Sequence, residues 1–382
     1  MDLFQREHNI KKMKAKIKVA GVGGGGRNAL NHMISRGIEG VEFIAVNTDA
    51  QDLVKNSAPY MVQIGEQLTK GLGVGGNPSR GRKAAEESTE DLKHLISGTD
   101  LLFVTAGMGG GTGTGAAPVL AKLAKEMMGD KILVIAVVTR PFEFEGYVRS
   151  QNAEEGIAEI QKYADSTIII PNEKLFEIID SKTSTKEAFS MVDKILLQAV
   201  RGISDVITYP GQVNIDFRDV ETIMRNCGKS LIGIGEAEGD NRHIEAIKQA
   251  ITSPLLENTD IQGARGFLVH FLSGDDITLK EQGEVMNIVK QNANNKTEII
   301  YGFSTDENLG NKMKITIVAA GFDANTAAGM MKRKAITSKM NSSNGAGDSG
   351  LGNDMSSLFA TKKEMKDTEK MLIPTFLRNK KD

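Results

Sequence analysis

Two glycine-rich runs are the residues of this sequence best suited to bind a charged ligand. Gly21–Gly26 contains five glycines and Gly107–Gly115 contains six. Backbone N–H groups without side chains can surround phosphate oxygens, and a helix N-terminus adds partial positive charge. Six glycines in nine residues would weaken a helix start, with no benefit expected from packing. We therefore interpret both runs as cradles for phosphate groups.

The first run, taken alone, also fits a dinucleotide site. It matches G-x-G-x-x-G, and Asp49 follows at the end of the next apolar run, where an NAD site places an acidic residue. The second run changes this interpretation, because two cradles at neighbouring strand ends would hold a diphosphate or triphosphate from both sides. The hydroxyls of Thr112 and Thr114 add ligands for phosphate or Mg²⁺.

Two further stretches resemble phosphate loops less closely. Residues 70–78 precede a helical pattern at 79–88, and they either close over a terminal phosphate or form an ordinary surface loop. Cys227–Ser230 has the G-K-S ending of a Walker A loop. However, Ile223 stands where the first glycine of that motif is required, and a helical pattern precedes it instead of a strand. We therefore exclude a Walker A site.

The elements that must position these loops are short β-branched runs separated by helical patterns such as 27–37 and 117–129. The apolar runs mostly lack alternation, which is typical of strands buried on both faces of a parallel sheet. They cover residues 17–23, 41–47, 101–107, 132–138 and 166–171. The expected fold is α/β, a doubly wound and largely parallel sheet.

The rest of the chain predicts a second, smaller domain. A helical pattern at 183–207 has no strand before it and connects two units. Fewer, better alternated strand runs follow, which indicate an α+β domain with one sheet face left to solvent or to a partner. The expected divisions are an N-terminal extension (1–15), a nucleotide-binding domain (16–182), the connecting helix (183–207), the smaller domain (208–322), a disordered linker (323–368) and a docking peptide (369–382).

Composition narrows the classes of function. The chain has 382 residues, and 47 Lys and Arg against 49 Asp and Glu give a net charge of −2, which argues against a nucleic-acid binder. A single cysteine excludes an internal disulfide and a cysteine-based zinc site. No apolar stretch is long enough to cross a membrane, and no secretory signal is present. We expect a soluble protein of a reducing compartment.

The glycine loops also resemble a known family. GGGTGTG at 109–115 is the signature of the tubulin/FtsZ GTPases, and AGMGGGTGTGAAP at 106–118 is more similar to their bacterial cell-division branch than to the tubulins. The resemblance covers nearly the whole chain, in family order, through VGGGGRN (22–28), TKGLGVGGNP (69–78), TRPFEFEG (139–146), NIDFRDV (214–220) and IPTFLR (373–378). It implies GTP or GDP as the ligand, Mg²⁺ as the cofactor and GTP hydrolysis as the activity.

The resemblance assigns nucleotide contacts residue by residue. Glu145 and Arg149 match positions near the ribose and phosphates, and Asn172 and Asp193 match the positions that read guanine. A carboxylate can accept two hydrogen bonds from guanine N1–H and N2–H₂, which adenine lacks. Phe189, one turn before Asp193, would stack on the base. The implied phosphate set is Gly24, Gly25, Gly26, Arg27, Asn28, Gly107, Met108, Gly109, Gly110, Gly111, Thr112 and Gly113.

Residue type alone favours plainer roles for three of these residues. Phe189 would belong to the core, and Asp193 would lie on a solvated helix face. Asn172 would be the N-cap of a helix at 173–180.

The implied catalytic residues are Asn214, Asp216 and Asp219. The two carboxylates would orient and polarise a water for attack on the γ-phosphate. The local pattern alone predicts a helix cap, with Asp216 at the N-cap and Asp219 three residues later. In the family this loop acts on the nucleotide of the next subunit, so hydrolysis requires a head-to-tail filament.

Two other functions compete with this interpretation. An NAD-dependent oxidoreductase would use Gly21–Gly26 and Asp49, but it needs one glycine loop and a nearby histidine, and none of the five histidines lies in the loops. A non-catalytic, nucleotide-gated scaffold would differ only at 214–220, where the aspartate pair is intact.

The resemblance also implies partners and a place in the cell. The chain itself would be the main partner, in filaments of the division (Z) ring at mid-cell in the cytoplasm. The peptide 369–382 would dock on membrane-tethering division proteins such as FtsA, because it has too few apolar residues to insert into a bilayer by itself. Arg27 departs from the family pattern as a bulky cation, and the tail lacks the acidic residues expected before IPTFLR.

Overall fold

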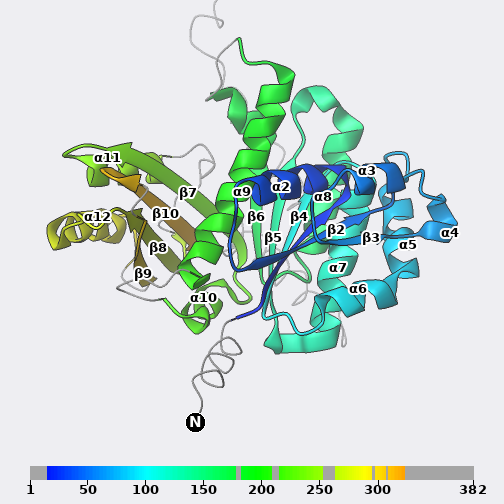
Figure 1. Cartoon of the computed structure of the whole chain (residues 1–382), viewed down its shortest axis with the longest axis horizontal. Helices are drawn as coiled ribbons and strands as arrows, with labels where there is room; N and C mark the ends of the chain where they lie inside the picture. Colours follow the sequence, from blue (N-terminus) through cyan, green and yellow to red (C-terminus); the bar gives the residue numbers. More distant parts are fainter. Residues whose placement is uncertain are drawn as a thin grey trace, which may run out of the picture. The chain divides into compact units, whose positions relative to one another are not determined.

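The computed structural model describes residues 15–177, 182–208, 215–252, 263–294, 297–306 and 309–322 (Figure 1). Within these ranges the strands form one sheet in the order β3-β2-β1-β4-β5-β6-β7-β10-β8-β9. Neighbouring strands from β3 to β7 run parallel, β10 is antiparallel to both β7 and β8, and β9 is parallel to β8. The predicted α/β, doubly wound and largely parallel fold is confirmed.

The bounds of the elements follow the chain. The strands are β1 (Ile17–Val22), β2 (Val41–Asn47), β3 (Tyr60–Gln63), β4 (Leu101–Gly107), β5 (Leu133–Arg140), β6 (Ser166–Pro171), β7 (Gly228–Glu238), β8 (Gly266–Ser273), β9 (Glu298–Thr305) and β10 (Lys312–Ala320). The helices are α2 (Gly23–Ser35), α3 (Ala50–Val54), α4 (Glu66–Thr69), α5 (Pro78–Glu87), α6 (Thr89–Ile96), α7 (Thr112–Met128), α8 (Tyr147–Ile160), α9 (Thr185–Thr208), α10 (Phe217–Met224), α11 (Arg242–Ile251) and α12 (Leu279–Gln291). Short 3₁₀ turns are η1 (Gly129–Lys131), η2 (Glu143–Glu145) and η3 (Asn172–Glu177).

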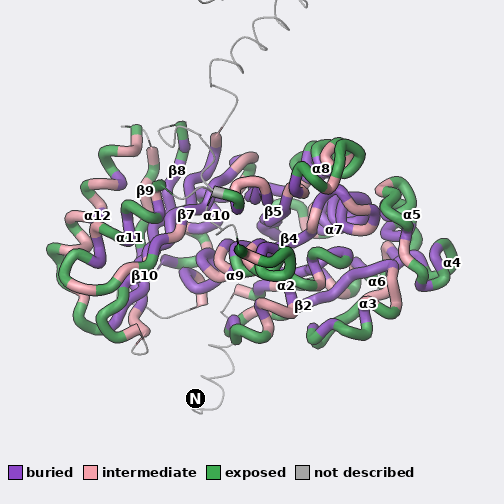
Figure 2. The backbone as a smooth tube through the Cα atoms, turned by 90° about the horizontal axis from the view of Figure 1, so that it is seen from above, coloured by how far each residue is buried: buried purple, intermediate pink, exposed green. Residues whose placement is uncertain are grey.

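The strands of the first half are buried on both faces, as their unbroken apolar runs predict. Alternate side chains of a strand point to opposite faces, so Val19 packs in the cluster of α2 and α9, whereas Ala20 and Val22 pack in the cluster of α5 to α8. Figure 2 shows the central strands and α7 as mostly buried, while the outer surfaces of α4, α5 and α8 are exposed. Helices on both faces fix the strand ends, where the glycine loops begin.

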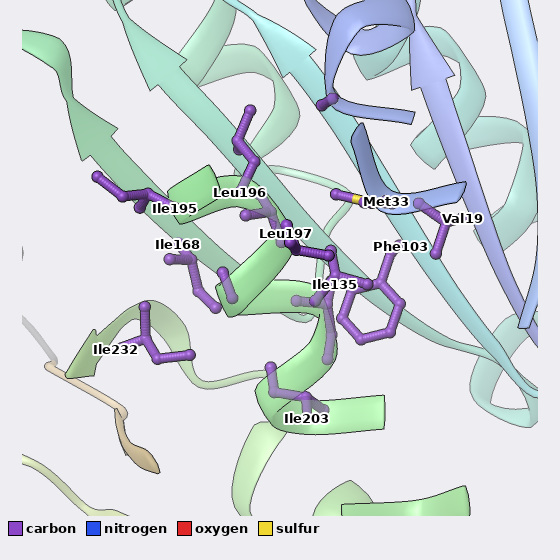
Figure 3. Packing of buried hydrophobic residues seen from close by; sticks show 14 of the residues in the cluster. Val19, Met33, Phe103, Ile135, Ile168, Ile195, Leu196, Leu197, Ile203 and Ile232 are labelled. Atoms are coloured by element: carbon purple, nitrogen blue, oxygen red, sulfur yellow. The ribbon is translucent and has the colours of Figure 1, made fainter. Parts of the chain in front are cut away.

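Helix α9 is the long connecting element, predicted at 183–207 and observed at Thr185–Thr208. Its apolar face points at the strands, where Leu196, Leu197 and Ile203 join Ile135 and Ile168 in one cluster (Figure 3). The helix packs along the sheet and therefore extends from one end of the strands to the other.

Strand β8, in the second half of the sheet, is also covered on both faces. Helices α11 and α12 cover the face of β8 that carries Phe267 and Val269, whereas Leu268 packs in the cluster of α9. Strand β8 is buried along its whole length. The expectation of a solvent-facing or partner-facing sheet face is therefore wrong for this strand, because its second face packs in the cluster that contains α9 and α10. The neighbouring β9 keeps Glu298 and Tyr301 exposed.

Other expectations on domain organisation are not decided by the structure. Strand β7 pairs with β6 over three residues, Gly228–Ser230, so the sheet continues past the connecting helix. The N-terminal extension up to residue 14, the linker (323–368) and the docking peptide (369–382) lie outside the described residues. Among the helices that are described, none has the length and apolar character needed to cross a bilayer.

Candidate functional site

Two helices begin at the same edge of the sheet without side-chain caps. Helix α2 follows β1 directly, α7 follows β4 after a short loop, and β1 and β4 are neighbours in the sheet. The N-cap residues Val22 and Gly111 provide no side-chain hydrogen bond, and neither first turn contains an acidic residue. The free N–H groups and the helix dipoles therefore favour an anion at this edge.

The predicted helices begin earlier than expected. Helix α2 starts at Gly23 instead of residue 27, and α7 starts at Thr112 instead of residue 117. Most glycines of the first run thus lie inside the first helical turn and not in a free loop. An N-terminal turn of glycines leaves the N–H groups uncovered by side chains.

A cavity of about 330 Å³ opens at this edge. Its lining includes ten of the seventeen predicted nucleotide contacts, which are Gly25, Asn28, Gly107, Met108, Gly110, Glu145, Arg149, Asn172, Phe189 and Asp193. The other predicted contacts, which are Gly24, Gly26, Arg27, Gly109, Gly111, Thr112 and Gly113, do not line it. The structure brings both glycine loops and the residues predicted to read the base around one cavity. Their contacts with a nucleotide stay a prediction.

Several glycines of the second run are required by close packing. A Cβ atom on Gly113 would lie 2.7 Å from the carbonyl oxygen of Gly107, and one on Gly111 would lie 2.8 Å from the backbone nitrogen of Asn77. A Cβ atom on Gly110, in contrast, would have no atom within 4 Å apart from its own chain neighbours, and Gly110 lines the cavity. The expectation that packing gives these glycines no role is wrong, because the start of α7 is enclosed by strand ends and α5.

The hydroxyls proposed as phosphate or Mg²⁺ ligands are engaged within the protein. Thr114 is buried, and its hydroxyl accepts a hydrogen bond from the N–H of Gly109 at 2.8 Å. The hydroxyl of Thr112 lies 2.7 Å from that of Thr48. The Thr114 side chain thus holds the signature loop in shape, and its role as a phosphate or Mg²⁺ ligand stays a prediction.

The third glycine-rich stretch, residues 70–78, does not line the cavity. Val74 is buried, and a Cβ on Gly111 would lie 2.4 Å from its Cγ2. The stretch therefore packs on the signature loop, and its contact with a terminal phosphate stays one of two open interpretations.

Two polar side chains at one end of the cavity carry oxygens that accept no hydrogen bond from the described residues. Asp193 is half-buried, and within the described residues its carboxylate accepts no hydrogen bond. Burial raises its pKa from 3.8 to about 7, although the positive charge of Arg27 opposes the shift. Asn172 is 4% exposed, and its Oδ1 has no hydrogen-bond partner. Buried polar groups without partners favour a ligand that supplies them.

Phe189 borders these two side chains. Its ring contacts the buried ring of Phe142 edge-on, with centroids 5.4 Å apart, and 39% of the residue remains exposed. It is therefore anchored in the core on one side and free on the other. Val192 and Leu196, on the same face of α9, add an apolar wall to the cavity.

An ion pair forms the rim of the cavity. The Arg149 guanidinium pairs with one carboxylate oxygen of Glu145, and the other oxygen accepts the N–H of Phe142 at 3.0 Å. The pair is held in place by the backbone and still borders the cavity. It can contact polar groups of a ligand whose base lies near Asp193.

The residues that the dinucleotide interpretation requires are used differently. Asp49 is the N-cap of α3, and its Oδ1 accepts the N–H of Asp52 at 3.0 Å. The Arg27 Nε lies 3.2 Å from Oδ1 of Asp52, and its guanidinium donates to Oδ1 of Asn28. Asp49 is thus a structural cap. Arg27 is held by Asp52 and Asn28 and does not line the cavity.

The aspartate pair forms the predicted helix cap at the start of α10. The Asp219 N–H donates to Oδ1 of Asp216 at 2.9 Å, and the Asp216 N–H donates to Oδ2 of Asp219 at 3.0 Å. Asp216 is exposed and Asp219 is half-buried. Asn214 lies outside the described residues. The cap leaves the remaining carboxylate oxygens available for another partner.

The aspartate pair and the cavity lie at opposite edges of the sheet. The cavity residues Thr139 and Pro141 stand at the end of β5, whereas Arg225, which follows α10, donates to the carbonyl of Ile132 just before β5. Seven residues of strand separate these points by about 23 Å. Helix α9, which packs along the sheet, covers a similar length: the fifteen residues from Asp193, at the cavity, to Thr208, at the end of the helix, rise about 22 Å. Figure 1 shows α10 below the sheet.

Sequence reasoning did not identify Thr139, Pro141, Val192 and Leu196 as cavity residues. The first two follow a strand end beside β4, where ligands gather in open α/β sheets. The other two share the helical spacing of Phe189 and Asp193. Both signals were present in the sequence.

Comparisons with known proteins agree with this geometry. A family model described as the GTPase domain of the Tubulin/FtsZ family matches residues 16–180, and one described as the C-terminal domain of the FtsZ family matches residues 228–323. An empty FtsZ dimer from M. jannaschii is 43% identical, with a TM-score of 0.78, and the match covers 85% of this chain and 94% of that one. A point mutant of FtsZ from the same organism is 44% identical, with a TM-score of 0.77, and covers 83% and 94%. A CetZ2 protofilament with bound GTPγS from Haloferax volcanii is 21% identical, with a TM-score of 0.69, covers 85% and 99%, and shares the fold.

Proposed function

This chain belongs to the tubulin/FtsZ family of GTPases, and from that premise we propose that it polymerises head to tail into filaments of a bacterial division (Z) ring. It binds guanine nucleotide and hydrolyses GTP. The proposed place of action is the cytoplasm at mid-cell. The FtsZ dimer and the CetZ2 protofilament among its relatives support self-association of this chain.

The base end of the cavity suits guanine. The ionised carboxylate of Asp193 would accept the N1–H and N2–H₂ hydrogen bonds, which adenine does not offer in this pattern. The amide of Asn172 would supply a further polar contact, and Phe189 would stack on the ring. Within the part of the chain that the structure describes, the Asp193 carboxylate and Oδ1 of Asn172 accept no hydrogen bond, which supports this assignment.

The other end of the cavity, near the two glycine loops, suits the phosphates of a nucleoside triphosphate. The N–H groups at the starts of α2 and α7 would hold the phosphates from two sides, near Gly25, Gly107 and Gly110. Glu145 and Arg149 would lie near the ribose and phosphates. Within the described part of the chain no three His, Cys, Asp or Glu side chains gather to hold a metal. Mg²⁺, which would neutralise phosphate charge, would therefore be held chiefly by phosphate oxygens and water.

We base the proposal of an active site shared between two subunits on the separation of the aspartate pair from the cavity. Arg225, at the C-terminal end of α10, contacts the start of β5, about 23 Å along the strand from the cavity residue Thr139 of the same subunit. In a head-to-tail stack, the α10 edge of one subunit meets the cavity edge of the next, and such a contact repeats without closing. There the two carboxylates would orient a water and accept its proton as it attacks the γ-phosphate.

Hydrolysis in this arrangement changes the contact between subunits. Loss of the γ-phosphate removes the group on which the neighbour's aspartates act, so the contact weakens and the filament turns over. The tail 369–382, outside the described residues, is proposed to link filaments to membrane-tethering partners such as FtsA.

A concentration series tests the shared site. The GTPase rate per subunit is expected to rise with protein concentration and to level off above the polymerisation threshold, measured by phosphate release and sedimentation. A constant rate across that range would refute the proposal.

Asp219→Ala gives the matching variant. It is expected to bind GTP and form filaments, because the cavity is remote from the substitution, and to lose most of its turnover. Normal hydrolysis by this variant would remove Asp219 from the active site.

A further inference from the structure

An ionic network joins α10 to the first half of the sheet, at the edge opposite the cavity. Its centre is Asp165, whose side chain is fully buried. The Lys125 Nζ lies 2.9 Å from both of its carboxylate oxygens, and the Val134 N–H donates to Oδ2 at 2.8 Å. A buried carboxylate with this many donors is a fixed point of the structure.

Arg225, immediately after the last residue of α10, connects the helix to this fixed point. Its Nη1 donates to the carbonyl of Ile132 at 3.4 Å and lies 3.8 Å from Oδ1 of Asp165. Its Nη2 pairs with Glu221, one turn back on α10. One guanidinium, with a side chain 19% exposed, thus contacts its own helix and the start of β5 together.

Glu221 completes the connection on the helix side. Its side chain is 12% exposed, with one carboxylate oxygen paired with Arg225 and the other with Arg218. The position of the Arg225 guanidinium is therefore set from two directions, by α10 and by the strand edge.

Apolar packing fixes the rotation of α10 about its axis, and the ionic network fixes its position along that axis. Val220, Ile223 and Met224 are buried and decide which face of the helix points inward. Apolar contacts are non-directional, so they resist sliding along the helix axis less than a fork of hydrogen bonds does. The opposite end of this short helix carries Asp216 and Asp219 in their reciprocal cap. A shift at Arg225 is thus transmitted to both carboxylates.

We propose that Arg225 is a positioning residue for GTP hydrolysis, because it fixes α10 against the start of β5 and so aims Asp216 and Asp219 at the nucleotide of the neighbouring subunit. This inference rests on the proposed shared site. A displacement of reacting groups by about 1 Å lowers rates up to about a hundredfold. Nucleotide binding is unaffected in this mechanism, since the cavity lies across the sheet.

The test compares Arg225→Ala with Arg82→Ala in the full chain. Arg82 also joins two elements through an ion pair, 3.0 Å from Glu159 between α5 and α8, but it is remote from α10. Arg225→Ala is expected to lower kcat about tenfold or more, with KM for GTP and sedimented filament unchanged. Arg82→Ala is expected to keep the wild-type kcat. Arg225→Lys, which retains the charge but not the fork, should recover part of the rate.

A double variant separates positioning from loss of fold. If Arg225 acts through the aspartates, adding Arg225→Ala to Asp219→Ala lowers the residual rate no further, whereas a structural defect adds its full effect. Wild-type kcat in Arg225→Ala, an equal loss in Arg82→Ala, or additive losses would overturn the inference. Full activity of Asp219→Ala would instead refute the proposed shared site. An inactive Asp219→Ala beside a fully active Arg225→Ala would refute the positioning role alone.

Discussion

Asp193 is expected to destabilise the nucleotide-free protein at neutral pH. Its carboxylate is half-buried and has no hydrogen-bond donor among the described residues, and burial raises its pKa from 3.8 to about 7. Because the pKa is higher in the folded state than in the unfolded chain, the folded state holds more protons between about pH 4 and pH 7. The free energy of unfolding therefore falls as the pH rises through this window, and the full penalty is present above it. Asp193→Asn keeps the size of the side chain and removes the charge.

The size of the penalty follows from the two pKa values. At 1.36 kcal/mol for each pH unit, a shift from 3.8 to about 7 corresponds to an upper limit of roughly 4 kcal/mol. Partial exposure of the carboxylate allows water to screen the charge, so we expect about 2 kcal/mol. The charge of Arg27 already reduces the shift and is contained in the pKa of about 7.

The assay is urea denaturation of nucleotide-free protein at several pH values from 5 to 8. Asp193→Asn should be more stable than the wild type, and the difference should widen by about 1 kcal/mol or more up to pH 7 and then stay constant. Asp240→Asn, which replaces an exposed carboxylate of the second half, serves as the matched control and should follow the wild type. With saturating GTP the advantage of the variant should shrink by about 1.4 kcal/mol or more, because GTP binds the variant at least about tenfold more weakly while ATP binds both proteins equally poorly.

Two results would refute this reasoning. Parallel stability curves for wild type and Asp193→Asn would show that the carboxylate is not held in a desolvated place. Retained preference for GTP over ATP in the variant would show that Asp193 does not read the base.

Three further substitutions, one of them with a matched control, test other parts of the structure. Phe189→Ala should raise the Kd for GTP about tenfold through lost stacking, and an unchanged Kd by calorimetry would contradict this. Gly113→Ala should lower the free energy of unfolding by more than about 2 kcal/mol, because a Cβ would lie 2.7 Å from a backbone oxygen, while Gly110→Ala should fold like the wild type; equal stabilities in denaturant would oppose the packing argument. Lys125→Met removes the cation nearest the fully buried Asp165 and should destabilise by about 3–5 kcal/mol, so a loss below about 1 kcal/mol would show that Arg225 replaces it.

The fold was predictable where a strand is buried on both faces. The run 132–138 has no polar position and 101–107 has only Thr105, and a covered parallel sheet explains that pattern. Strand β7 (Gly228–Glu238) was missed because its apolar stretch is short and interrupted by Gly233 and Gly235. A Cβ on Gly235 would lie 1.9 Å from the carbonyl oxygen of Ala246, so that glycine serves the contact with α11, which no local pattern reveals.

The site was predictable in its residue types and less so in their tasks. Both glycine runs do border one cavity, as their places after neighbouring strands imply. Sequence could not separate Gly110, which has open space around it, from Gly113, which has none, because the difference depends on how closely the strand ends and α5 approach the start of α7. Residues in the same motif therefore serve binding and packing side by side.

The dependence of hydrolysis on assembly, in the proposed mechanism, follows from the fold and needs no separate regulatory device. The cavity is built at the end of β5, and α10 is fixed near its start by Arg225 and Asp165. The strand between these points is a central member of the sheet, buried from Leu133 to Thr139, so it can be neither shortened nor bent to bring Asp219 to the cavity of its own subunit. An isolated subunit thus holds GTP without its catalytic carboxylates, and only a second copy placed end to end supplies them. Any variant that hydrolyses GTP equally well as a monomer must have detached α10 from the sheet, which exposes Val220 and Met224 and would appear as a loss of stability.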